Sequence, residues 1–394
     1  MKIALVTDFY LPSLGGLQTS TVNQRKALEN SGNEVFVFTA KYDKAEPTDD
    51  SHVIRVTSRN MPGLGFPVVS PSEKLKSFLL KEFSKRKIDV IHIQTEFGLA
   101  QTAMWAGNEL GIPVFYTSHT YSWKTAYPIP RLQAKVIQIF YRFLFGTDLK
   151  MVDSIPGEDS ASRALRSIRT VVNKRADVLI CPSKHMFEAL NPERDQKPGF
   201  VVPNPVTAIS KLAPRPLPEV VRFVWPSRIE PEKRILEFIE AVLIANKLTK
   251  IPFFVDIIGE GALLEKAKLL AEGAKNIKFH GRLTQDQTVT IMDKDSLVVI
   301  SSSGYDNQPM IIAEALSRDR GVLYCDPNLN DSLKKAGYLS GDQPKQLARA
   351  IKELVEDPSK IKALAEAAKV NKDQFSEQTY SQTITDLYKK FASK

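Results

Sequence analysis

The sequence predicts an α/β protein of two doubly wound domains, each a parallel sheet with helices on both faces. Apolar runs of strand length alternate with helical segments through nearly all of the 394 residues. Strands that are apolar on both faces indicate a parallel sheet that is covered on both sides. The alternation starts again after a proline-rich stretch, residues 203–218, which indicates a linker. A chain of this length also suits two cores better than one.

The first series of segments predicts the N-terminal domain. One helix is expected to begin at about Thr19 and to stop at Gly32, because glycine favours the position just after a helix, and another ends at Gly111. The expected strands are Lys2–Thr7, Glu34–Thr39, Asp89–Gln94, Ile112–Thr117, Ala176–Cys181 and Phe200–Val202.

The second series predicts a C-terminal domain, and two or three helices follow Gln343. We expect domains at residues 1–204 and 205–375, with a last helix, 376–394, that packs back on the first domain. Ligands of such sheets bind beyond the carboxyl ends of the strands, and two facing domains form a cleft. The expected strands are Arg222–Trp225, Phe253–Ile258, Ile277–His280, Ser296–Ile300 and Val322–Cys325.

The composition is that of a globular protein with a basic surface. Hydrophobic residues make up 43% and charged residues 25%, and the net charge is +9. This charge fits nucleic acid, an anionic membrane surface, anionic small substrates or a plain solvated surface. Nucleic acid ranks low, because no zinc spacing, recognition helix or RNA-binding aromatic motif occurs.

Several features of the sequence favour a cytoplasmic location. No run of about 18 apolar residues occurs that could cross a membrane. The segment Met1–Asp8 is expected to be a first strand rather than a signal peptide. Cys181 and Cys325 lie in apolar runs and are expected to be buried free thiols.

The first candidate motif is the loop Pro12–Leu17, which joins a strand to a helix. Gly15 and Gly16 let the backbone approach a ligand closely, and the helix N-terminus offers N–H groups to a phosphate. The dinucleotide fingerprint G-x-G-x-x-G is absent, which argues against an NAD enzyme. A simple tight turn is the alternative.

The second candidate motif, Ser227–Lys233, follows the first strand of the second domain. Its two cations, Arg228 and Lys233, are suited to clamp a diphosphate. Fixed cations there would also stabilise the charge that develops on a leaving nucleoside diphosphate. An exposed surface pair is the alternative.

The third candidate motif is Ser301–Leu316, a buried strand end, a loop of small residues and a helix. Pro309 suits the first helical position, so the N–H groups of the next residues, 310–312, would point into the cleft. Asp306 precedes this helix and Glu314 lies inside it. Ionised carboxylates only accept hydrogen bonds, which suits the hydroxyls of a sugar and a ribose.

Together these motifs resemble the retaining glycosyltransferases of family 4, which have the GT-B fold. The hallmark of that family is Glu, seven residues, Glu, and positions 306 and 314 keep the spacing. The resemblance implies that Asp306 contacts the donor hexose, that Glu314 binds ribose hydroxyls, and that Arg228 and Lys233 bind the diphosphate. It also matches the glycine pair and the histidine of the family to Gly15, Gly16 and His119.

The resemblance covers nearly the whole chain and implies an N-terminal acceptor-binding domain and a C-terminal nucleotide-sugar-binding domain. Arg282 and Leu283 would lie near the nucleotide base, and Phe375-Ser376 precede the last helix. His119, Asp306, Arg228 and Lys233 are the implied catalytic residues. The full set implied to bind the donor is Gly15, Gly16, Arg228, Lys233, Arg282, Leu283, Asp306, Asn307, Gln308, Pro309, Met310, Ile311 and Glu314.

The chain departs from the family pattern at several points. Asp306 is one methylene shorter than glutamate, which affects the sugar contact. Asp319-Arg320-Gly321 replaces Gly-x-Pro, and aspartate tolerates the left-handed turn needed there. Asn204-Pro205 replaces Asn-Gly, and Arg234 replaces the glycine after the lysine.

The remaining histidines give no metal-ligand spacing, so neither a metal nor another cofactor is expected, and Arg228 and Lys233 would supply the positive charge. His92 lies in a predicted strand and is expected to be a satisfied core residue. His52 and His185 are expected at ordinary surface or helix positions.

Two segments bear on the acceptor. Ser72–Lys87 combines an apolar helical face with lysines, and Tyr121–Phe145 is rich in aromatic and basic residues, including Trp123 and Tyr127. A basic amphipathic helix can lie on an anionic leaflet. Packed core with solvated lysines is the alternative for both segments.

A local likeness favours a lipid acceptor. The stretch Gln94–Leu99, with Ser118–Tyr121, is similar to Firmicute-type diacylglycerol glucosyltransferases. The resemblance therefore implies transfer of a hexose, from UDP-glucose or UDP-galactose, to a membrane lipid such as diacylglycerol, by an enzyme peripheral to the inner face of the cell membrane. Transfer to a capsule or cell-wall glycan is the alternative. A nucleotide-sugar epimerase or an inactive sugar-nucleotide-binding protein is the alternative of another class.

Overall fold

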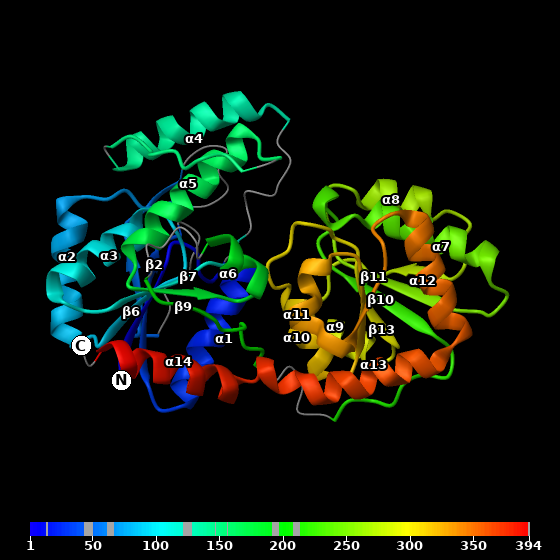
Figure 1. The fold of residues 1–394 in the computed structure, drawn as a ribbon. Coiled ribbons are helices and arrows are strands. Elements are labelled where there is room, and N and C mark those ends of the chain that lie inside the picture. Colours follow the sequence, from blue (N-terminus) through cyan, green and yellow to red (C-terminus); the bar gives the residue numbers. More distant parts are fainter. Residues whose placement is uncertain are drawn as a thin grey trace. The chain divides into compact units, whose positions relative to one another are not determined.

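The computed structural model describes residues 1–12, 15–42, 50–60, 67–120, 128–145, 147–155, 157–190, 197–207 and 213–392 (Figure 1). The chain forms two compact units. Unit 1 comprises Met1–Pro205 and Glu377–Lys394, and unit 2 comprises Val206–Ser376. Each unit is a parallel sheet between layers of helices, as the alternating pattern predicts.

The sheet of unit 1 has the order β3-β2-β1-β6-β7-β8-β9, and its neighbouring strands are parallel. The order reverses between β1 and β6, because the chain runs from β1 to β3 on one side and then returns to the other. Loops that leave these two strands therefore form the crevice of a doubly wound sheet. The strands are β1 (Lys2–Thr7), β2 (Glu34–Ala40), β3 (Val53–Val56), β6 (Val90–Ile93), β7 (Val114–Thr117), β8 (Val178–Cys181) and β9 (Gly199–Val201).

Helices cover both faces of this sheet. The last helix packs against α1 and buries Tyr380, Ile384 and Tyr388 in the core beside Ile3 and Leu5 of β1. The helices of unit 1 are α1 (Gly16–Asn30), α2 (Glu73–Arg86), α3 (Gly98–Leu110), α4 (Pro130–Phe145), α5 (Ser160–Arg175), α6 (Lys184–Leu190) and α14 (Glu377–Ala392).

The sheet of unit 2 has the order β12-β11-β10-β13-β14-β15, again with parallel neighbours, and it reverses between β10 and β13. Its strands are β10 (Arg222–Pro226), β11 (Phe254–Ile258), β12 (Ile277–Phe279), β13 (Leu297–Ile300), β14 (Gly321–Tyr324) and β15 (Gly337–Leu339). Its helices are α7 (Ile235–Leu248), α8 (Leu264–Leu270), α9 (Gln285–Met292), α10 (Met310–Ser317), α11 (Asn330–Leu333), α12 (Pro344–Glu356) and α13 (Pro358–Asn371), with 3-10 turns at η3 (Pro231–Lys233), η4 (Pro327–Leu329), η5 (Lys334–Ala336) and η6 (Lys372–Phe375).

The predicted strands occur in the structure within two residues of their expected ends. The first helix begins three residues earlier than expected, at Gly16, and Gly32 follows its end with a positive φ of 85°. Asp319 takes the left-handed conformation expected of it, with φ 56°. The edge strands β3 and β15 and the small antiparallel pair β4 (Arg59–Asn60) and β5 (Pro67–Val68) are not expected from the sequence.

Both cysteines are buried and free, as predicted. Among the described residues, no helix combines the length and apolar character needed to cross a membrane. Part of the aromatic segment, residues 121–127, lies outside the described residues, as do Ser13 and Leu14 of the glycine loop.

Candidate functional site

The predicted cations and the first predicted carboxylate follow β10 and β13, the two strands at which the sheet of unit 2 reverses. Arg228 and Lys233 lie after β10, and Asp306 lies after β13. Because the strands are parallel, their carboxyl ends share one edge of the sheet, where doubly wound proteins bind ligands. The fold thus gathers the side chains that the sequence separates.

The loop after β10 is fixed against the loop after β11. The Ser227 N–H donates to the Ile258 carbonyl over 3.0 Å, and the Ile229 N–H donates to the Glu260 carbonyl over 2.8 Å. Gly259 has φ 139°, and a Cβ atom there would lie 1.8 Å from the Ser227 carbonyl oxygen. Glycine is therefore required at 259 for the two loops to meet, and their contact sets the position of Arg228.

Lys233 and Asp306 form an ion pair at the centre of this edge. Lys233 Nζ lies 2.5 Å from Asp306 Oδ1, and both side chains are mostly buried. The Ser302 hydroxyl donates to Asp306 Oδ2, and Lys233 Nζ lies 5.1 Å from the centre of the Tyr305 ring. Lys233 and Asp306 are expected from the sequence to bind different parts of a ligand, and the structure joins them directly.

A chain of hydrogen bonds holds the backbone of Lys233 to β13. Trp225 Nε1 donates to Ser301 Oγ over 2.8 Å, and Ser301 Oγ donates to the Lys233 carbonyl over 2.7 Å. Trp225 is itself fully buried in β10. The Lys233 ammonium is therefore attached to a rigid part of the core, which reduces the entropy lost when it binds an anion.

Arg228 is the exposed cation of this edge, with 64% of its side chain accessible. Its Nη2 lies 2.9 Å from Glu232 Oε1, and it also hydrogen-bonds Tyr305. Burial raises the pKa of Tyr305, and the bond from Arg228 opposes that rise. Arg228 can leave so exposed a pair for an incoming anion at little cost.

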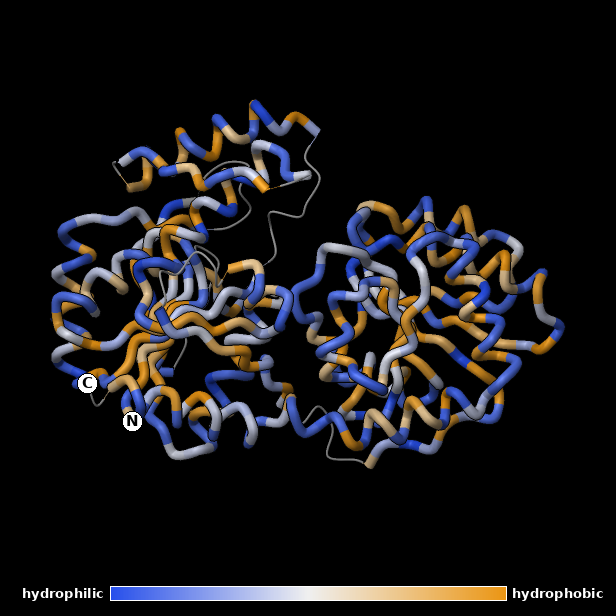
Figure 2. Tube along the Cα trace, viewed as in Figure 1, coloured by the Kyte–Doolittle hydropathy of each residue, from blue (hydrophilic) through white to orange (hydrophobic). Residues whose placement is uncertain are grey.

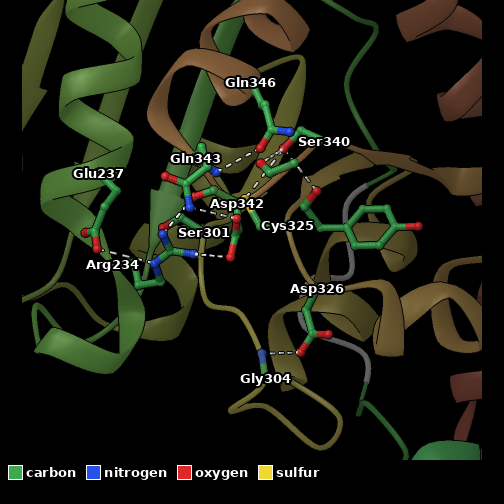
Figure 3. Close-up of polar contacts among 12 residues, drawn as sticks. Arg234, Glu237, Ser301, Gly304, Cys325, Asp326, Ser340, Asp342, Gln343 and Gln346 are labelled. Carbon is green, nitrogen blue, oxygen red and sulfur yellow. Dashed lines mark hydrogen bonds and ion pairs between the residues drawn. The ribbon is translucent and has the colours of Figure 1, made fainter.

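Three polar contacts in Figure 3 brace the loops that carry these residues. Gly304, with φ 70°, donates its N–H to Asp326 Oδ2 over 2.7 Å. Arg234, with φ 56°, reaches the Asp342 carbonyl over 2.7 Å and Glu237 Oε1 over 3.3 Å. Position 234 is left-handed, which explains why glycine suits it, and the two contacts of Arg234 compensate for the strain.

The start of α10 corrects one prediction. Pro309 is extended and precedes the helix, which begins at Met310 rather than at Pro309. The Ile312 N–H donates to the Pro309 carbonyl over 3.0 Å. The Ile312 N–H is therefore not available to a ligand. Of the three N–H groups expected to bind one, those of Met310 and Ile311 remain candidates.

Glu314 lies one turn inside α10 and accepts a hydrogen bond from Gln285 Nε2 over 3.1 Å. Burial raises the pKa of Glu314, and the bond from Gln285 opposes that rise. Gln285 begins α9, two residues after the predicted base-proximal residue Leu283. Sequence reasoning missed Gln285, because an exposed glutamine at a helix start gives no functional signal.

Arg282 is exposed, while Leu283 packs against the core that includes Ile312 and Met292. Gly281 precedes them with φ 69°, and its carbonyl accepts the Gly259 N–H over 2.8 Å. Asn307 and Gln308 are buried between Asp306 and α10 along the chain. The structure does not bring Arg282 into a polar contact that identifies its role.

The predicted residues of unit 1 lie at the carboxyl ends of its strands. His119 follows β7, and its Nε2 lies 2.6 Å from Gln94 Oε1 at the end of β6. Burial, with a smaller contribution from the Arg169 cation, lowers the pKa of His119 to about 3. The imidazole is therefore neutral near pH 7 and can accept or donate a hydrogen bond.

His92 is a core residue, as predicted. Its Nδ1 lies 2.5 Å from the Tyr388 hydroxyl, and its Nε2 lies 2.6 Å from Thr117 Oγ1. Burial lowers its pKa to about 3. His52 and His185 are both partly exposed.

A buried carboxylate beside β1 was missed by the sequence analysis. Asp8 accepts hydrogen bonds from Thr95 Oγ1 over 2.6 Å and from the Leu99 N–H over 3.1 Å. Burial raises the pKa of Asp8 to about 6, although these bonds lower it. The available signal was an acidic residue directly after a buried strand, at the point where the sheet reverses.

A second buried carboxylate, Glu96, lies 2.9 Å from Arg169 Nε and accepts a hydrogen bond from the Tyr116 hydroxyl over 2.6 Å. Within the predicted segment Gln94–Leu99, the Glu96 side chain therefore makes structural contacts inside unit 1.

Gly15 and Gly16 lie at the start of α1. Gly15 is extended, and the Thr19 N–H donates to its carbonyl over 2.9 Å. A Cβ atom on Gly16 would meet nothing within 4 Å, so packing of the described residues does not require glycine there. Open space at this position would also allow a ligand to approach the backbone.

Two family models match successive parts of the chain. Glycosyltransferase Family 4 matches residues 14–208, and Glycosyl transferases group 1 matches residues 217–371. The first lies almost wholly in unit 1 and the second wholly in unit 2.

Individual relatives agree with these models. The chain is 23% identical over 415 residues to an alpha-monoglucosyldiacylglycerol synthase of Acholeplasma laidlawii, covering 98% of this chain and 96% of the relative. An enzyme of the same name from Streptococcus pneumoniae is 35% identical over 127 residues, which are 30% of this chain and 27% of that protein. The crystal structure of Anabaena HepE in complex with UDP superposes with a TM-score of 0.71 at 16% identity, covering 99% of this chain and 100% of that chain.

Proposed function

We propose, since the chain belongs to the glycosyltransferases of the GT-B fold, that it moves a hexose from a UDP-sugar to a hydroxyl of a membrane lipid with retention at the anomeric carbon. The observation that carries the proposal is the grouping of Arg228, Lys233 and Asp306 at the β10–β13 edge of unit 2. The relatives named for monoglucosyldiacylglycerol synthesis and the UDP complex of HepE support the acceptor and the donor.

Arg228 and Lys233 would bind the diphosphate of the donor. The guanidinium can make paired hydrogen bonds to phosphate oxygens, and the ammonium acts as a point charge. When the bond between the anomeric carbon and the phosphate oxygen breaks, negative charge grows on the leaving diphosphate. Cations already fixed in place stabilise that charge without reorganisation, so the reaction needs no metal ion.

Asp306 would act in two ways. Its contact with Lys233 sets the position of the ammonium, and its carboxylate can accept a hydrogen bond from a hexose hydroxyl. Glu314, partly buried beside Gln285, would accept hydrogen bonds from ribose hydroxyls. Retention would follow if the acceptor hydroxyl attacks on the face that the diphosphate leaves and passes its proton to a phosphate oxygen.

His119 would hydrogen-bond a hydroxyl of the donor or the acceptor. Its low pKa keeps it neutral, so its role is to orient a hydroxyl rather than to donate a proton. Gly15 and Gly16 would allow the start of α1 to approach the ligand.

The test is a transfer reaction with paired donors and acceptors, read by mass spectrometry. UDP-glucose, UDP-galactose and GDP-mannose are each offered with a short-chain diacylglycerol or a soluble glycan. A product heavier by one hexose on the lipid, formed from a UDP-sugar, supports the proposal. Transfer to the glycan alone would show that the acceptor is a glycan rather than a lipid. Conversion of UDP-glucose to UDP-galactose without transfer, resolved by chromatography because the two have the same mass, would show that the protein is an epimerase.

A further inference from the structure

Helix α4 has two apolar faces. One face packs on α5, where Ala134 and Tyr141 are buried with Ala164, and Ile137 and Phe145 lie against the same cluster. The other face is exposed among the described residues. Its side chains are between 56% and 69% accessible and are those of Leu132, Val136, Ile139 and Phe143, together with Ile129 directly before the helix. Figure 2 shows apolar residues recurring along the whole length of this helix.

The exposed apolar residues form one stripe. They recur at intervals of three and four residues, which places them within an arc of about 80° on a helix of 3.6 residues per turn. The buried residues occupy a separate arc, centred roughly opposite. A stripe of five large apolar side chains is far more than the scattered single residues expected on a surface, so it marks an interaction site.

Cations border this stripe on one side. Arg131, Lys135 and Arg142 are exposed and share an arc of about 40° between the stripe and the α5 face. Pro130–Phe145 contains no aspartate or glutamate. The helix therefore offers apolar side chains beside a row of positive charge, the composition of helices that lie in the plane of an anionic bilayer.

We propose that the exposed face of α4 docks on an anionic lipid bilayer, with the stripe (Ile129, Leu132, Val136, Ile139, Phe143) in the acyl boundary and the three cations at the headgroup phosphates. The proposal rests on the proposed function, because a lipid acceptor must be reached at a membrane. A second copy of the chain, paired antiparallel through this stripe, would place the two rows of cations together, which is unfavourable.

Helix α2 does not offer a comparable surface, although the sequence analysis put both segments forward. Its apolar residues Leu75, Leu79 and Phe83 are buried in the core of unit 1. Its lysines therefore lie on the solvated side of a helix whose apolar face is packed in the core. The structure separates the two segments, and α4 is the one with an apolar face left uncovered.

The first test measures binding of the full-length protein to vesicles by flotation. Vesicles of phosphatidylcholine alone are compared with equimolar phosphatidylcholine and phosphatidylglycerol. The variant Ile139→Gln/Phe143→Gln should bind the anionic vesicles on the order of 100-fold more weakly than the wild type. The matched control, Leu269→Gln/Val370→Gln in unit 2, removes apolar side chains that are 70% and 79% exposed and should bind normally.

The second test concerns the cations. The variant Arg131→Gln/Lys135→Gln should lose about 5-fold in anionic-vesicle binding for each charge removed, and the loss should shrink as salt is added. The control Lys345→Gln/Lys362→Gln removes the same charge from exposed lysines of α12 and α13 and should have little effect. Equal effects of both pairs would show that net charge alone drives binding and would overturn the role of α4.

Docking and catalysis are separated by assaying transfer to a short-chain diacylglycerol in detergent micelles. The stripe variants should keep wild-type turnover there and lose it only on vesicles. Wild-type transfer without vesicle binding would overturn the docking proposal alone, and vesicle binding without any transfer would overturn the proposed function alone. A wild-type dimer that the stripe variant converts to monomers, with no vesicle binding, would assign the face to a second copy instead.

Discussion

Lys233 Nζ lies 2.5 Å from Asp306 Oδ1, although 73 residues separate them in the sequence. The pair joins the loop after β10 to the loop after β13, across the point at which the strand order of unit 2 reverses. The family motif has glutamate at this position. In this chain the shorter side chain of Asp306 pairs with Lys233. The pair therefore links the proposed diphosphate and hexose contacts, which the sequence alone treats as separate.

The coupling of this pair is tested by a double-mutant cycle. Lys233→Met and Asp306→Asn should each lower kcat/KM for UDP-sugar transfer on the order of 100-fold. The double variant should lose much less than the product of the two losses, because either change already breaks the pair. Steady-state transfer rates of the four proteins decide this, and additive losses would show that the two residues act independently.

His119 is expected to act as a neutral hydrogen-bonding group. Since burial lowers its pKa to about 3, it stays uncharged throughout pH 5–8. The variant His119→Gln should lower transfer by a constant factor across that range, whereas His119→Ala should lower it further. A ratio of wild-type to His119→Gln activity that changes through pH 6–7 would mean that His119 titrates there.

Asp8 is expected to make unit 1 less stable as the pH rises. Its folded pKa, about 6, lies above the ordinary value of 3.8, so the folded state binds more protons than the unfolded state between these values. The stabilisation is complete below pH 3.8 and is lost as the pH rises through about 6. Relative to the wild type, Asp8→Asn should gain about 2 kcal/mol of unfolding free energy between pH 4 and pH 7. Denaturant unfolding at both pH values measures the gain, and an equal difference at both would contradict it.

The contact of the β10 and β11 loops is tested at Gly259. Gly259→Ala should weaken UDP binding strongly, because its Cβ would lie 1.8 Å from the Ser227 carbonyl and displace the loop that carries Arg228. Gly273→Ala is the matched control, since Gly273 also has a positive φ, 82°, but its Cβ would meet nothing within 4 Å. The control should lose about 1–2 kcal/mol of stability and bind UDP normally, by calorimetry. Equal loss of UDP affinity in both would assign the effect to backbone strain rather than to the loop contact.

Most strands of both sheets could be predicted from the sequence, because their apolar runs and flanking glycines are local signals. The edge strands β3 and β15 could not, since short strands with partly exposed residues such as Arg55 and Leu339 lack a continuous apolar run. The start of α10 was misplaced by one residue, because proline suits both the first helical position and the residue before it.

The site was predictable as a set of loops but not as a set of contacts. Arg228, Lys233, Asp306 and Glu314 follow strands whose order brings them to one edge, which the alternating pattern implies. The partners Ser302 of Asp306 and Gln285 of Glu314 depend on side-chain placement, for which a single sequence carries no signal. The same holds for α4, whose two apolar faces cannot be assigned to core or surface until the packing on α5 is known.

The most direct test of the donor site combines UDP affinity with hexose transfer in Glu314→Gln. The control Glu240→Gln changes an exposed glutamate of α7. The account predicts that Glu314→Gln, folded as judged by its unfolding transition, loses UDP affinity and lowers transfer on the order of 100-fold, while the control matches the wild type. Wild-type UDP affinity and transfer in folded Glu314→Gln would contradict the assignment of the donor site to this edge of unit 2.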